Sequence, residues 1–108
     1  NNLLSANQAI NFYKKKALFK YVTFTSKNNC LINEEIFYDE STEIVFKCFS
    51  DILSLISATY YPPRSKKIIN LIKRLKNDKF TKSTLGGCII EKKDSFISVS
   101  KETRGRKI

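Results

Sequence analysis

The chain has 108 residues, which suffices for one domain with a hydrophobic core and is short for two. Hydrophobic residues make up 42% of it, which argues against disorder, and no stretch approaches the roughly 18 apolar residues of a transmembrane helix. The formal net charge of +10 indicates either a polyanionic partner or the solvated surface of a lysine-rich protein. The chain begins with Asn1 rather than Met, so we expect it to belong to a longer protein.

The first third of the chain predicts a helix followed by a strand. Apolar residues recur three or four positions apart, at Leu3, Ala6, Ile10 and Tyr13. This spacing predicts a helix over residues 1–13. Residues 18–25 are rich in aromatic and β-branched side chains, which predicts an extra strand there. The segment 30–38 is ambiguous, with Asn33 as a possible cap of a short helix that buries Ile36 and Phe37.

A core helix is predicted over about 42–61. Its apolar residues follow helical spacing, at Val45, Phe49, Ile52, Leu53, Ile56 and Tyr60. Ser41 or Thr42 is expected to cap its start. Pro62 and Pro63 prevent it from continuing, because proline lacks the amide donor and clashes with the preceding turn.

A basic helix is predicted over about 65–77, with Ser65 as its N-cap. One face is apolar and consists of Ile68, Ile69, Leu71, Ile72 and Leu75. Residues 64–82 hold eight Lys or Arg and one acid, Asp78. We expect the apolar face to pack on the core helix and the basic face to point outward.

A β-hairpin is predicted at the C-terminal end. After Thr84 the apolar period becomes two, giving strands over 88–91 and 96–100 and a turn over 92–95. Gly86 and Gly87 are expected to form a tight bend or to admit the close approach of another backbone. The predicted fold class is therefore α+β, a small helical domain with a C-terminal hairpin and a possible extra strand near 18–25.

The sequence offers little for catalysis. It contains no histidine, and Cys30, Cys48 and Cys88 form no C-x-x-C motif, so we expect neither a metal site nor a cofactor in this chain. The odd number of cysteines without a secretory signal predicts reduced thiols that pack as small hydrophobic residues in a cytoplasmic protein. Residues 82–87 are not a Walker loop, because the glycines follow the lysine instead of preceding it.

The residues expected to bind a polyanion are Arg64, Lys66, Lys67, Lys73, Arg74, Lys82 and Tyr61. Lys and Arg on one helix face neutralise phosphates. The proline turn holds Arg64, which therefore loses less freedom on binding. Tyr61 could stack on a base, whereas the helical phase of Tyr60 favours the core.

Three linked motifs carry a resemblance to a known family. They are Tyr61-Pro62-Pro63-Arg64, Thr84-Leu85-Gly86-Gly87-Cys88 and Lys101-Glu102. Together they resemble the C-terminal region of bacterial tRNA(Ile)-lysidine synthetases, over roughly residues 44–102. The resemblance implies an ATP-dependent ligase that adenylates the wobble cytidine of isoleucine tRNA bearing a CAU anticodon, after which lysine displaces AMP.

The resemblance also implies how this chain takes part. The family's ATP-binding Ser-Gly-Gly-x-Asp-Ser motif belongs to an N-terminal domain and is absent here, so ATP and lysine are expected in that domain. Residues 1–108 would then form the non-catalytic tRNA-recognition domain, with the tRNA and the protein's own catalytic domain as partners. The resemblance gives no role to the Thr84-Leu85-Gly86-Gly87 motif.

Two other readings use the same residues. In one, the chain is a protein docking or dimerisation domain whose basic face meets an acidic protein surface. In the other, which the missing catalytic residues make the weakest, it is an enzyme by itself.

Overall fold

The computed structural model describes residues 2–26, 28–58, 62–77 and 79–102, with side chains from residue 12 onward. Its helices are α1 (Asn2–Tyr21), α2 (Ile36–Asp39), α3 (Thr42–Ser57) and α4 (Ser65–Leu75). Its strands are β1 (Val22–Ser26), β2 (Asn29–Asn33), β3 (Lys82–Leu85), β4 (Cys88–Lys93) and β5 (Phe96–Lys101). Over this described part the chain is α+β, which confirms the predicted class.

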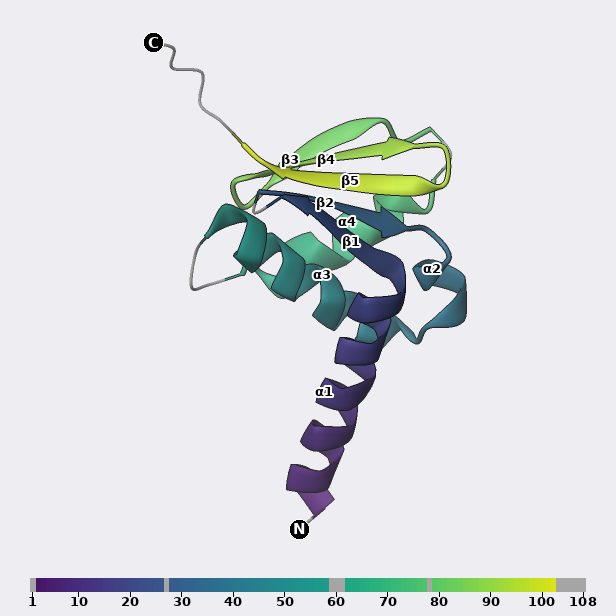
Figure 1. Cartoon of the computed structure of the whole chain (residues 1–108), viewed down its shortest axis with the longest axis vertical. Helices are drawn as coiled ribbons and strands as arrows, with labels where there is room; N and C mark the ends of the chain where they lie inside the picture. The colour runs from purple at the N-terminus through teal and green to yellow at the C-terminus, as the bar shows by residue number, and fades with distance from the viewer. Residues whose placement is uncertain (1, 27, 59–61, 78, 103–108) are drawn as a thin grey trace.

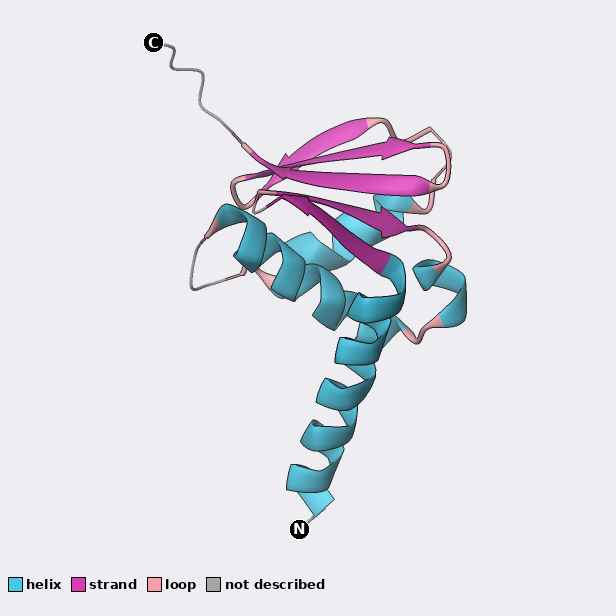
Figure 2. Ribbon diagram, viewed as in Figure 1, coloured by secondary structure: helices cyan, strands magenta, loops and turns pink. Residues whose placement is uncertain are grey.

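The strands form one antiparallel sheet in the order β1-β2-β5-β4-β3 (Figure 1). Helices α3 and α4 lie against one face of this sheet, and the N-terminal part of α1 extends away from the body (Figure 2). The sheet is larger than the predicted hairpin plus one strand, because β2 and β3 add to it.

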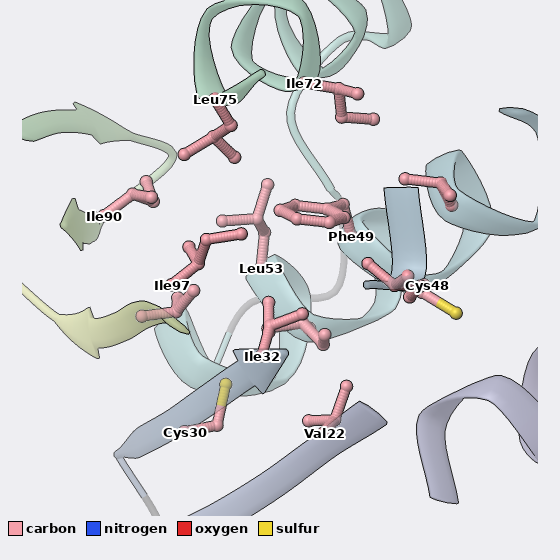
Figure 3. Close-up of a cluster of buried hydrophobic side chains, with 14 of the residues drawn as sticks. Val22, Cys30, Ile32, Cys48, Phe49, Leu53, Ile72, Leu75, Ile90 and Ile97 are labelled. Carbon is pink, nitrogen blue, oxygen red and sulfur yellow. The ribbon is translucent and has the colours of Figure 1, made fainter. Parts of the chain in front are cut away.

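The core lies between the sheet and α3 (Figure 3). The strand residues that face the helices alternate along each strand and are buried: Cys30, Ile32, Cys88, Ile90, Ile97 and Val99. They meet the predicted apolar face of α3, whose residues Phe49, Ile52, Leu53 and Ile56 are fully buried. The hydrophobic spacing of α3 therefore fixes which of its faces covers the sheet.

The N-terminal third departs from prediction. Helix α1 does not end near residue 13 but continues through Tyr21, so the strand predicted over 18–25 begins at Val22. Ala17 and Tyr21, one helical turn apart, are both buried, and the Tyr21 hydroxyl donates to Asp39 Oδ2 at 2.9 Å. These tertiary contacts outweigh the β propensity of residues 18–21.

The core helix begins as predicted. Ser41 is its N-cap, and its Oγ accepts a hydrogen bond from the Ile44 N–H at 3.3 Å. The helix ends at Ser57, and Ala58 follows in the left-handed conformation with φ of 60°. The remainder of the predicted range, 59–61, lies outside the described residues, together with Tyr60 and Tyr61.

The basic helix is shorter than predicted. Helix α4 ends at Leu75, and the N-cap position belongs to Arg64 rather than to Ser65. Ile68, Leu71, Ile72 and Leu75 are buried, whereas Ile69, predicted on the same face, is 42% exposed. Ile69 lies on α4 just outside the helix face that these four buried residues form.

The segment 30–38 resolves into a strand and one turn of helix. Asn33 ends β2, and its Oδ1 accepts from the Glu35 N–H at 2.9 Å, so it shapes the turn before α2 instead of being the N-cap. Helix α2 does bury Ile36, as expected.

The C-terminal hairpin is confirmed with a tighter turn. Lys92 and Lys93 belong to β4, which leaves Asp94 and Ser95 as the turn, with Asp94 at φ of 53°. A second hairpin precedes it, since Gly86 and Gly87 join β3 to β4. β3 is therefore an edge strand of the sheet, next to α4 in sequence.

Candidate nucleic-acid interface

Helix α4 presents its basic face outward because its opposite face is buried. With Ile68, Leu71, Ile72 and Leu75 in the core, the exposed residues of the helix include Lys66, Lys67, Lys73 and Arg74. This is the arrangement that the sequence predicts.

A shallow groove runs between α4 and the edge strand β3. It consists of two hollows that share Arg74. One, of about 270 Å³, is lined by Arg74, Asn77, Lys79, Phe80, Thr81 and Lys82. The other, of about 170 Å³, is lined by Lys67, Asn70, Leu71, Arg74, Ser83, Thr84 and Leu85. We call this surface, with its cations Lys67, Arg74, Lys79 and Lys82, the basic groove.

Arg74 stands at the centre of the basic groove and is held from two sides. Its Nη1 donates to Ser83 Oγ at 3.2 Å, and its guanidinium carbon lies 5.5 Å from the centroid of the Phe80 ring. Guanidinium carries five N–H donors, of which contacts within the described residues engage one. The side chain is thus oriented by the protein and retains donors for an anion.

The charges of the groove are not neutralised by ion pairs among the described residues. The ion pairs there join Lys14 to Asp51 (2.8 Å) and Lys92 to Glu34 (3.6 Å), and both lie outside the groove. Asp78, the one acid in the basic segment, lies outside the described residues. The groove is therefore a concentrated positive surface suited to a polyanion.

The predicted binding residues fall into three groups. Lys67, Arg74 and Lys82 come together in the groove. Arg64, Lys66 and Lys73 are exposed at the start of α4 and along its outer face, and they do not line the groove. Tyr61 lies outside the described residues.

The wall of the groove opposite α4 is not predicted by the sequence. It is lined by Phe80 from the segment before β3 and by Ser83 and Thr84 of β3. Lys79 also lines the groove and is not among the residues expected to bind a polyanion. The sequence signal was weak because β3 reads KSTL, without an apolar alternation that would mark a strand.

All three cysteines pack in the hydrophobic core. All three are free and buried, and Cys88 Sγ donates to the Leu53 carbonyl at 3.5 Å. Burial raises the pKa of Cys30 and of Cys48 to about 12 and that of Cys88 to about 11. A thiol with so high a pKa makes a poor nucleophile at neutral pH, which fits the predicted packing role.

A second exposed surface lies at the opposite edge of the sheet, on α1 and β1. Phe12, Phe19 and Phe24 are 61%, 93% and 48% exposed. Phe19 and Phe24 also line a hollow of about 480 Å³ together with Leu18 and Val22. We call this surface the aromatic face.

No protein-family model, curated protein sequence or solved structure gives a significant match to this chain. Over the described ranges, no helix combines the length and the apolar character needed to cross a bilayer. Within the same ranges no three Cys, Asp or Glu side chains lie together as ligands for a metal ion.

Proposed function

We propose that this chain is an RNA-binding domain that contacts phosphates through the basic groove. The observation that carries the proposal is the groove itself. Four cations line two adjoining hollows, two of them from α4, one from the segment before β3 and one from β3 itself, with Arg74 oriented by Ser83 and Phe80. Cations placed along a groove neutralise successive phosphates of a nucleic-acid backbone.

The shape of the groove favours a polymer over a small molecule. Both hollows are shallow, and most of the residues that line them are polar or charged, the exceptions being Leu71, Phe80 and Leu85. Small-molecule sites, in contrast, are concave, enclosed and mostly apolar. Arg64, Lys66 and Lys73 extend the positive surface past the groove along α4. A chain of phosphates spanning several of these cations suits this arrangement.

The identity of the RNA rests on the resemblance of the sequence motifs. It points to isoleucine tRNA with a CAU anticodon and to a full-length ATP-dependent tRNA(Ile)-lysidine ligase in the cytoplasm. In that setting this chain recognises the tRNA, and ATP and lysine bind to the catalytic domain.

A titration tests the proposal. The chain is titrated against isoleucine tRNA and an unrelated tRNA at 50 and 200 mM salt. We expect binding whose affinity decreases steeply as the salt concentration rises. If the isoleucine tRNA binds more tightly than the unrelated tRNA, part of the specificity lies in this domain. Absence of binding to either RNA at 50 mM salt overturns the proposal.

The aromatic face supports a second candidate function, docking onto protein. Lys15 lines the same hollow, and Lys16 Nζ lies 6.0 Å from the centroid of the Phe12 ring, so two copies meeting there would bring like charges together. The fitting partner is an apolar protein surface with an acidic rim, such as one on the catalytic domain. We expect sedimentation to show a monomer, and we expect Phe19→Ser to weaken association with the catalytic domain while leaving RNA affinity unchanged. A dimer that Phe19→Ser dissociates would instead identify a second copy as the partner.

A further inference from the structure

The motifs at Pro62–Arg64, Thr84–Cys88 and Lys101–Glu102 meet at one corner of the fold. Pro63 lies against Gly86, and the Glu102 N–H donates to the Gly87 carbonyl at 2.9 Å. The turn between β3 and β4 is thus in contact with the turn that precedes α4.

The backbone of the β3–β4 turn requires positive φ at two positions. Gly86 has φ of +59° and Gly87 of +83°, which is the pattern of a type I′ hairpin turn. Asn-Gly is a strongly preferred pair in such turns. The turn by itself therefore accepts asparagine at position 86.

Packing against Pro63 is what excludes a side chain at position 86. A Cβ built on Gly86 would lie 2.6 Å from Pro63 Cγ and 3.4 Å from its Cδ. The pyrrolidine ring is closed onto the backbone and cannot rotate away. At Gly87 the corresponding Cβ would meet Ser57 Cβ at 3.4 Å, which is an ordinary contact.

Pro63 is joined directly to the start of α4. Arg64 follows it as the N-cap residue, and the Arg64 carbonyl accepts from the N–H groups of Lys67 and Ile68 at 2.9 and 3.1 Å. The contact between Pro63 and Gly86 thus connects the hairpin to the first turn of α4. Lys67 on α4 and Thr84 on β3 line the two walls of the groove near this point.

We infer that Gly86 is a positioning residue for RNA binding. By letting the hairpin close on Pro63, it sets Arg64 and Lys67 at a fixed place beside β3. This inference rests on the proposed function, and it gives the Thr84-Leu85-Gly86-Gly87 motif a role. That role is to hold the end of the basic groove together rather than to touch the RNA.

A matched pair of variants tests the inference. Gly86→Asn and Gly87→Asn each place the side chain most tolerant of positive φ in the same turn, and only the first meets Pro63. We expect Gly86→Asn to weaken tRNA binding about fivefold to tenfold near 0.1 M salt and to lower the salt slope by about one, as for the loss of one phosphate contact. Gly87→Asn should stay within about twofold of the unaltered chain.

A second readout does not depend on RNA. An arginine-specific protease cuts at Arg64, and cleavage there reports how firmly the turn before α4 is held. We expect cleavage at Arg64 to be about threefold or more faster in Gly86→Asn than in Gly87→Asn. Equal cleavage rates and equal RNA affinities in the two variants overturn the inference, even when the unaltered chain binds RNA. Failure of the unaltered chain to bind RNA overturns the proposed function, and with it the positioning role, whatever the cleavage rates.

Removing the Pro63 ring tests whether the ring is what makes Gly86→Asn defective. Pro63→Ala deletes Cγ and Cδ, the ring atoms nearest to the new side chain. Because Pro63→Ala also removes the constraint of the ring, the comparison is made in that background: adding Gly86→Asn to Pro63→Ala should change neither the melting temperature nor the rate of cleavage at Arg64. This outcome is decisive also when Gly86→Asn alone does not fold. A double variant that melts lower or is cleaved faster at Arg64 than Pro63→Ala alone contradicts the packing argument.

Discussion

Replacing Lys67 with glutamine should change the salt dependence of RNA binding by a definite amount. Four cations line the basic groove: Lys67, Arg74, Lys79 and Lys82. Each neutralised phosphate of a duplex contributes about −0.9 to the slope of log affinity against log salt, so the four groove cations together contribute about −3.6. Their contribution alone makes affinity fall about 150-fold between 50 and 200 mM salt. Without Lys67 the groove contributes about −2.7 to the slope, which corresponds to a fall of about 40-fold.

The matched control is Lys47→Gln. Lys47 is also an exposed helical lysine, but it lies on α3 with Glu43 and Asp51 one turn away on either side, outside the groove. Fluorescence anisotropy with labelled isoleucine tRNA at four salt concentrations from 50 to 200 mM gives both slopes. We expect Lys47→Gln to keep the slope of the unaltered chain. If Lys67→Gln and Lys47→Gln reduce the salt slope equally, net charge controls RNA binding, and the groove is not the binding site.

Three further predictions concern the fold. Ile72→Asp should unfold the domain, which circular dichroism would show as a loss of helical signal. Ile72 is 5% exposed, and an unpaired buried carboxylate costs several kcal/mol, whereas the total stability of a domain is about 5–15 kcal/mol. A cooperative melt like that of the unaltered chain would show that Ile72 is not in the core. Ser41→Ala should lower the free energy of unfolding in urea by about 1 kcal/mol through loss of the cap on Ile44, and an unchanged urea midpoint would contradict that cap. The buried thiols should react slowly with a thiol reagent at pH 8 and rapidly in urea. Because burial raises the pKa of Cys30 and Cys48 from 9.0 to about 12, their contribution to stability is fully present below pH 9 and is lost as the pH rises from 9 toward 12. The urea midpoint is measured at pH 8 and at pH 10 for the unaltered chain and for a Cys30→Ala and Cys48→Ala double variant. The midpoint of the unaltered chain should decrease more over this range than that of the double variant, and an equal decrease would contradict the prediction.

Elements with strong local signals could be predicted from the sequence. The core helix has a clear hydrophobic period, a serine cap at Ser41 and a proline stop, and it starts where expected. The buried residues of the β4–β5 hairpin alternate along each strand, and this pattern predicts both strands. In both cases local propensity and burial point to the same structure.

Elements that depend on partners distant in sequence could not be predicted. Residues 18–21 favour a strand locally, but Tyr21 is buried and bonded to Asp39, which keeps them helical. Strand β3 has no apolar alternation and is specified by its pairing with β4 across Gly86 and Gly87. The periodicity of α4 predicts its basic face, whereas no local pattern predicts the wall of the groove that β3 forms.

Amide shift mapping tests the location of RNA binding most directly. Isotopically labelled chain is titrated with unlabelled isoleucine tRNA, and perturbed backbone amides are assigned along the sequence. The groove predicts that the largest changes fall on α4 around Lys67 and Arg74 and on residues 79–84, with little change on α1 and β1. Changes confined to the aromatic face at Phe19 and Phe24, with α4 and β3 unaffected, would contradict RNA binding in the groove.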